Sequence, residues 1–143
     1  MNIIADHLRQ NEPTVVVWLA HSEELCEQAA SEFETAWSFL GNRPIHIWRF
    51  WGDRKLETAC LQDGIIIAGL SKTYNAARSN MSFIVELARH TSLVTIDEAH
   101  SAVAETYKLI LDALVVQRQK TALLGLSNTR QNVGRYPYRR TTC

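Results

Sequence analysis

The sequence predicts an α/β domain in which helices cover both faces of a mostly parallel five-stranded sheet, a three-layer architecture. Short apolar runs alternate along the chain with segments in which apolar residues recur every three or four positions. The runs show little polar alternation, which is typical of strands buried on both faces, and the segments between them supply the helical crossovers that parallel strands require. Composition agrees, because 46% of the 143 residues are hydrophobic and 21% are charged, as in one ordinary globular domain.

Five apolar runs are expected to form the strands. The first, at residues 15–19, follows Pro13 and is rich in β-branched side chains, which favour strands. A turn at Asp63-Gly64 leads into the third run. The expected strands are residues 15–19, 45–50, 65–68, 93–96 and 121–126.

The helices are predicted from the spacing of the apolar residues. The clearest helix runs from residue 25 to residue 40, with Ser22 as its N-cap, Glu23 and Glu24 favourable at its positive end, and Gly41 closing it. Residues 2–8 resemble the end of a helix and follow no strand, which is an unusual start for such a domain. Further helices are expected at residues 56–61, 81–89 and 105–116.

Charge and cysteine usage exclude several classes of protein. Lys and Arg together number 15, as do Asp and Glu, and this neutrality argues against a general nucleic-acid- or membrane-coating protein. The apolar runs are too short to cross a bilayer. Three widely spaced cysteines, Cys26, Cys60 and Cys143, indicate reduced thiols in a cytoplasmic protein, not disulfides or a zinc site. Cys26 and Cys60 are expected to pack in the core.

An acidic motif, Asp97-Glu98-Ala99-His100, directly follows the expected strand 93–96. In an open parallel sheet, ligands bind at the carboxyl ends of the strands, where these carboxylates would emerge. Adjacent Asp and Glu suit phosphoryl transfer, since one carboxylate can hold the magnesium shell while its neighbour orients the attacking water. The alternative is an ordinary acidic loop at a strand end.

Four blocks together carry a resemblance to a known family. The blocks are residues 19–29 (LAHSEELCEQA), 66–70 (IIAGL), 97–100 (DEAH) and 124–129 (LGLSNT). In this order they resemble motif Ia, the strand leading to motif Ib, motif II and motif III of the first motor domain of superfamily-two DEAD/DEAH-box helicases, and most of all the helicase (Res) subunits of type III restriction enzymes. The resemblance covers residues 1–127. It implies a RecA-like fold of the P-loop NTPase type and ATP-dependent helicase or translocase action on DNA.

The resemblance implies catalytic and coupling roles for five residues. Asp97 would hold magnesium through water, and Glu98 would polarise the water that hydrolyses ATP. His100, Ser127 and Thr129 would couple the nucleotide state to strand movement. Magnesium and ATP are the cofactors of the family.

A second set of residues is implied to lie along a nucleic-acid backbone, where such enzymes chiefly contact phosphates. The set is His21 and Ser22, together with Gly69, Ser71 and Lys72 in an expected turn. For His21 and Lys72 the alternative is solvated surface.

Aromatic and basic residues interleave at residues 48–55 (WRFWGDRK). This pattern would suit base stacking and phosphate binding. The favoured interpretation is a strand and turn that pack Trp48 or Trp51 against a neighbouring helix.

The glycine-rich phosphate loop of the family has no counterpart in the 143 residues. Such a loop needs Lys and Ser or Thr opening the helix that follows it. Gly64 and Gly69 have the right spacing, with Lys72-Thr73 nearby, but they flank an expected strand instead of following one. In the family the loop precedes the segment that corresponds to residues 1–8. The chain is therefore expected to be an incomplete motor domain, without a second motor domain, that neither binds ATP and magnesium tightly nor hydrolyses ATP.

Residues 128–143 differ from the rest of the chain. They contain four arginines and no acid, a charge of +4, whereas residues 1–127 carry −4. One interpretation is a basic disordered tail. The other is a frameshift, because loss of two nucleotides from codons for Ser-Ala-Thr-Pro-Gly yields Ser127, Asn128, Thr129 and Arg130, and the shifted frame restores the usual core of motif III.

The alternative function is a non-catalytic remnant that binds nucleic acid or protein. Loss of the motif I strand is expected to expose the edge of strand 121–126, and an unpaired edge invites pairing with a second chain, which predicts a homodimer. A partner that supplies the phosphate loop in trans is a third option.

Overall fold

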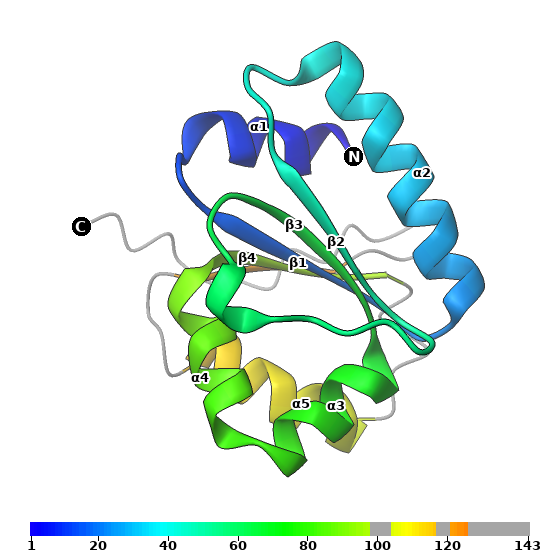
Figure 1. The fold of residues 1–143 in the computed structure, drawn as a ribbon, viewed down its shortest axis with the longest axis vertical. Coiled ribbons are helices and arrows are strands. Elements are labelled where there is room, and N and C mark those ends of the chain that lie inside the picture. The colour runs from blue at the N-terminus through cyan, green and yellow to red at the C-terminus, as the bar shows by residue number, and fades with distance from the viewer. Residues whose placement is uncertain (98–103, 117–120, 126–143) are drawn as a thin grey trace.

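The computed structural model describes residues 1–97, 104–116 and 121–125 as five parallel strands and their connecting helices. Figure 1 shows α1 and α2 on one face of the sheet and α3, α4 and α5 on the other. The predicted three-layer α/β fold is therefore confirmed. The strands are β1 (Val15–Ala20), β2 (His46–Phe50), β3 (Gly64–Gly69), β4 (Thr91–Ile96) and β5 (Ala122–Gly125).

The helices lie where the sequence predicts them, except that α3 is an additional helix and two predicted helical segments are wholly or partly of another helix type. Residues 56–61 contain only the short 3-10 turn η1, and the last described helix ends in a π-helical turn. The helices are α1 (Asn2–Gln10), α2 (Glu23–Leu40), η1 (Thr58–Cys60), α3 (Leu70–Ser79), α4 (Met81–His90), and α5 (Ala104–Leu111) continued by Asp112–Val116.

Strand β1 lies at the centre of the sheet, whose order is β2-β3-β1-β4-β5. It pairs with β3 from Val15↔Gly64 to Ala20↔Gly69, and with β4 on its other side. All six of its residues are buried, which explains why the run has no polar alternation. Since every pairing is parallel, the carboxyl ends of the strands meet at one edge of the sheet.

Alternate residues of the central strands pack into two separate hydrophobic cores, one on each face of the sheet. Val16 and Trp18 of β1 pack on the side of α1 and α2, against residues such as Leu8 and Phe33. Val17 and Leu19, together with neighbours from β3 and β4, pack on the side of α3, α4 and α5. Each fully buried aliphatic side chain contributes about 1.5–3 kcal/mol, so burial on both faces accounts for the central position of β1.

Helix α2 is capped at both ends by the residues that the sequence predicts, and it begins two residues earlier, at Glu23. The Ser22 hydroxyl accepts a hydrogen bond from the Leu25 N–H at 3.2 Å, which makes Ser22 the N-cap. At the other end the Gly41 N–H donates to the Trp37 carbonyl at 2.8 Å. A Cβ at Gly41 would lie 2.6 Å from the Trp37 ring, so this close approach requires glycine.

Two predictions about local structure are wrong. Gly69–Lys72 is not a turn, because Gly69 ends β3 and the next residues form the first turn of α3. The buried residues Leu70, Thr73 and Ala77 give this helix its inner face, but the polar residues between them mask the pattern in the sequence. Cys26 is buried as expected, whereas Cys60 is exposed because the short η1 turn presents no buried face.

Across residues 1–97, 104–116 and 121–125, no helix has the length and apolar character needed to span a membrane. The predictions for Glu98, His100, Ser127, Thr129, Cys143 and the segment 128–143 lie outside the described residues.

Candidate nucleic-acid interface and acidic motif

The carboxyl edge of the sheet gathers the described members of both predicted sets of site residues. His21 and Ser22 directly follow β1, whose last residue pairs with Gly69 of β3. Asp97 follows β4, whose Ile96 pairs with Leu19 of β1. The segments that resemble motifs Ia and Ib, and Asp97 at the start of the segment that resembles motif II, are therefore neighbours in space, as the sequence leads us to expect for parallel strands.

Asp97 is held close to the central strand. Its backbone N–H donates to the Leu19 carbonyl at 2.8 Å, which extends the pairing of β4 with β1 by one residue. Its carboxylate adds to a negative environment at the start of α2. Burial, followed by the charges of Glu23, Asp97 and Glu27, raises the pKa of the Cys26 thiol to about 12. Cys26 is therefore an inert core thiol.

His21 and Ser22 differ in their exposure and in their hydrogen bonds within the protein. His21 is exposed directly after β1. The Ser22 hydroxyl is half-buried and already accepts the capping hydrogen bond of α2. Any contact of Ser22 with a phosphate would compete with that cap, whereas His21 is accessible.

Lys72 is engaged within the protein. Its ammonium donates to the Gly52 carbonyl and lies 5.1 Å from the centroid of the Phe50 ring. Gly52 follows β2 and has a φ of +62°, a backbone conformation that favours glycine. Lys72 thus connects the start of α3 to the loop after β2, while its neighbour Ser71 is exposed.

The aromatic residues of 48–55 pack into the fold, as the favoured interpretation predicts. Trp51 is 1% exposed and belongs to the core under α1 and α2, and Trp48 is partly buried against the opposite core. The Arg54 guanidinium lies 4.5 Å from the Trp51 ring centroid and 3.5 Å from a Glu27 carboxylate oxygen. Trp51 therefore presents no free face for base stacking.

Residues 64–73, whose glycine spacing resembles that of a phosphate loop, do not form such a loop. Gly64 and Gly69 stand at opposite ends of β3, where both are paired with β1. The Thr73 hydroxyl donates to the Gly69 carbonyl at 2.9 Å, and Lys72 is bound to Gly52. These groups form no cradle of backbone N–H donors. In the described part of the chain, no three His, Cys, Asp or Glu side chains cluster as metal ligands.

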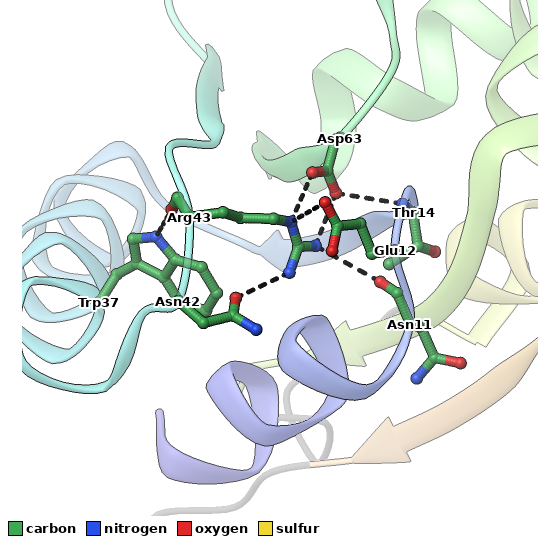
Figure 2. A network of polar contacts seen from close by, with 7 residues as sticks. All are labelled: Asn11, Glu12, Thr14, Trp37, Asn42, Arg43 and Asp63. Carbon is green, nitrogen blue, oxygen red and sulfur yellow. Dashed lines mark hydrogen bonds and ion pairs between the residues drawn. The ribbon is translucent and has the colours of Figure 1, made fainter.

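The opposite, amino edge of the sheet carries a polar network that the sequence analysis did not identify (Figure 2). The Arg43 guanidinium donates to both oxygens of Asp63, from Nε at 2.7 Å and from Nη2 at 2.8 Å. Asp63 also accepts from the Thr14 N–H at 3.1 Å. The Arg43 carbonyl in turn accepts from the Trp37 indole at 3.0 Å.

This network joins the segments that lead into β1, β2 and β3. Hydrogen bonding from Arg43, helped by the Thr14 N–H and opposed by partial burial, lowers the pKa of Asp63 below its ordinary value. The same pairing raises the pKa of Arg43. In the sequence, the Asp63-Gly64 pair signals only a turn, and Arg43 lies too far away to be assigned as its partner.

A parallel five-stranded sheet with Asp97 beside its central strand, and with the segments that resemble motifs Ia and Ib at the same edge, is the arrangement expected of a helicase-type motor domain with a RecA-like fold. The family model described as type III restriction enzyme, res subunit, matches residues 1–132, and the chain belongs to that family. No curated protein matches the sequence significantly.

Proposed function

We propose that residues 1–127 are part of the first motor domain of an ATP-dependent DNA helicase or translocase, and that the 143-residue chain by itself neither binds ATP tightly nor hydrolyses it. The family match and the gathering of Asp97 and the segments that resemble motifs Ia and Ib at one sheet edge support the first half. The second half rests on Gly64, Gly69 and Lys72, which are used within the fold and form no phosphate loop. Positioning of the phosphates supplies most of the catalysis of phosphoryl transfer.

The experiment measures ATP binding and turnover by the purified chain, with magnesium, in the presence and absence of single-stranded and duplex DNA. We expect no saturable binding in the micromolar range and no turnover that DNA stimulates. The matched control is Glu98→Gln, because a contaminating ATPase would be unaffected by it. DNA-stimulated turnover that disappears in Glu98→Gln would overturn the proposal of inactivity and support Asp97 and Glu98 as the acidic pair of a working site.

We assign the nucleic-acid contacts to the exposed residues of the carboxyl edge, chiefly His21 and Ser71, with Lys72 as a support for the loop after β2. Fluorescence anisotropy with a labelled single-stranded oligonucleotide, at several salt concentrations, tests this assignment. A single lost hydrogen bond to a phosphate weakens binding severalfold, and for the uncharged Ser71 it should leave the log–log slope against salt unchanged, because that slope counts contacts made by cationic side chains. His21→Ala and Ser71→Ala should weaken binding, whereas Arg9→Ala in α1 should not. If Arg9→Ala weakened binding as much as His21→Ala and Ser71→Ala, that result would contradict the assignment.

A second candidate function is a non-catalytic binding module that acts as a homodimer. Strand β5 supports it, since β5 forms one edge of the sheet and β4 is its partner among the described strands. An unpaired edge can accept a strand from a second chain. The test is the mass of the protein by light scattering over a wide concentration range. A lysine on an edge strand opposes such pairing.

Two edge-strand variants separate this dimer from other modes of association. Ala122→Lys in β5 and His46→Lys in β2 both alter an exposed position on an edge strand. We expect the first variant to abolish the dimer and the second to leave it intact. A monomer mass that does not change with concentration would rule the dimer out.

A further inference from the structure

Two buried side-chain polar atoms among the described residues have no hydrogen-bond partner in the protein. They are the indole nitrogen Nε1 of Trp18 and the hydroxyl oxygen Oγ1 of Thr95. Trp18 is 5% exposed and Thr95 is fully buried. Buried polar groups in native proteins are almost always hydrogen-bonded, because an unmet donor or acceptor retains the full cost of its desolvation.

The two unpaired groups are neighbours in the sheet. Trp18 of β1 pairs in register with Thr95 of β4. Paired residues of adjacent parallel strands project to the same face, and the strands lie about 4.8 Å apart. Trp18 belongs to the core under α1 and α2, to which Leu93, two residues before Thr95, also belongs. The side chains of Trp18 and Thr95 therefore project into the same core from paired positions on neighbouring strands.

The chemistry of the pair defines what binds between them. The indole N–H can only donate a hydrogen bond, whereas the threonine hydroxyl can both donate and accept. The occupant must therefore offer an acceptor to Trp18 and either a donor or an acceptor to Thr95. A core at the packing density of an organic crystal admits only a very small molecule of this kind. Water meets both conditions, and buried waters typically bind two to four polar groups.

We propose that one internal water molecule binds between Trp18 Nε1 and Thr95 Oγ1 and bridges the two central strands. It accepts the indole hydrogen and exchanges a hydrogen bond with the hydroxyl. The bridge joins β1, which leads to His21, to β4, which leads to Asp97. The water is thus a structural ligand of the sheet between the two motif-bearing strands, and this assignment does not depend on the proposed function.

Nuclear magnetic resonance of the full chain with 15N-labelled tryptophan tests the site directly. The indole resonance of Trp18 is assigned by its loss in Trp18→Phe. We expect a cross-peak between the Trp18 indole proton and a long-lived water in the unmodified protein. The absence of such a cross-peak, or a cross-peak to a protein hydroxyl or amide proton in its place, would overturn the proposal.

Two variants of Thr95 provide a second readout. Thr95→Val keeps the shape of the side chain and removes the hydroxyl, so it should weaken the water cross-peak and raise the unfolding equilibrium constant roughly fivefold to tenfold. Thr95→Ser retains the hydroxyl and should preserve the cross-peak. If Thr95→Val is as stable as the unmodified protein or more so, the hydroxyl is simply unsatisfied and no water bridges it, because removing an unmet polar group relieves its desolvation cost.

Discussion

Replacement of Arg43 by methionine tests whether the network at the amino edge of the sheet stabilises the fold. Arg43→Met keeps most of the apolar stem and removes the guanidinium that binds both oxygens of Asp63. Asp63 would then retain the hydrogen bond from the Thr14 N–H (Figure 2). The change therefore leaves a largely buried carboxylate without its cation.

The size of the effect follows from the exposure of the pair. The Arg43 side chain is 9% exposed and that of Asp63 is 20% exposed. Exposed ion pairs contribute about 0.2–1 kcal/mol, whereas removing one partner of a fully buried pair costs about 3–5 kcal/mol. We expect an intermediate loss of about 2 kcal/mol. For a domain of this size, that loss corresponds to a decrease in Tm of roughly 4–8 °C.

Thermal unfolding followed by circular dichroism at pH 7 measures this loss. The matched control is Arg49→Met, because Arg49 pairs with Glu34 and both side chains are more than a third exposed. The control should lose less than about 1 kcal/mol. If Arg43→Met melts within 1 °C of the unmodified protein, or no lower than Arg49→Met, the network does not act as we infer.

The dependence on pH supplies an independent check. The pKa of Asp63 is lower in the folded protein than in the unfolded chain. Its contribution is therefore complete above the unfolded value, about 3.9, and is lost as the pH falls through the lowered folded value. The difference in the free energy of unfolding between the unmodified protein and Arg43→Met should become smaller below about pH 4. A difference that stays constant between pH 7 and pH 3 would contradict an electrostatic cause.

Three further changes test other parts of the fold. Gly64→Ala should destabilise the domain by at least about 3 kcal/mol in urea unfolding, because φ is +154° and the new Cβ would lie 2.8 Å from the His46 carbonyl carbon. Gly69→Ala is its control, with the nearest atom at 3.6 Å, and should cost about 1 kcal/mol or less. Ser22→Ala should cost about 1 kcal/mol and Ser22→Asp almost nothing, since aspartate also caps helices, and equal losses would argue against the cap. With a pKa of about 12, only about 10⁻⁴ of Cys26 is thiolate at pH 8, so in a variant lacking the other cysteines a disulfide reagent should react only after unfolding. Rapid reaction of the folded variant would show that Cys26 is accessible.

The strands and the long helix could be predicted because local signals and tertiary burial agree. The run at β1 is apolar throughout and all of it is buried. Ser22 and Gly41 carry the capping chemistry that ends α2 in the structure. Helix α3 was missed because its fully buried residues are Leu70, Thr73 and Ala77, and a threonine among polar residues does not stand out as a core position. Cys60 was misplaced because cysteine is usually buried, whereas the η1 turn is mostly exposed.

The candidate site was only partly predictable, for a different physical reason. Residues that directly follow strands can be placed at one edge from the sequence, since parallel pairing determines where strands end. The partners of Lys72 could not be found in this way, because its contact with Gly52 depends on how the loop after β2 folds back. The Arg43–Asp63 pair and the Trp18–Thr95 register likewise join residues that only the assembled sheet brings together.

The central position of β1 has a consequence for how the chain folds. Val15 pairs with Gly64 and with Thr91, so β1 must wait for two partners that are made much later. Long-range parallel pairing of this kind is slow to form. Until then both edges of an apolar, β-branched segment, VVVWLA, are open to other chains. Aggregation during synthesis should therefore depend mainly on how soon β3 arrives to cover one side of β1.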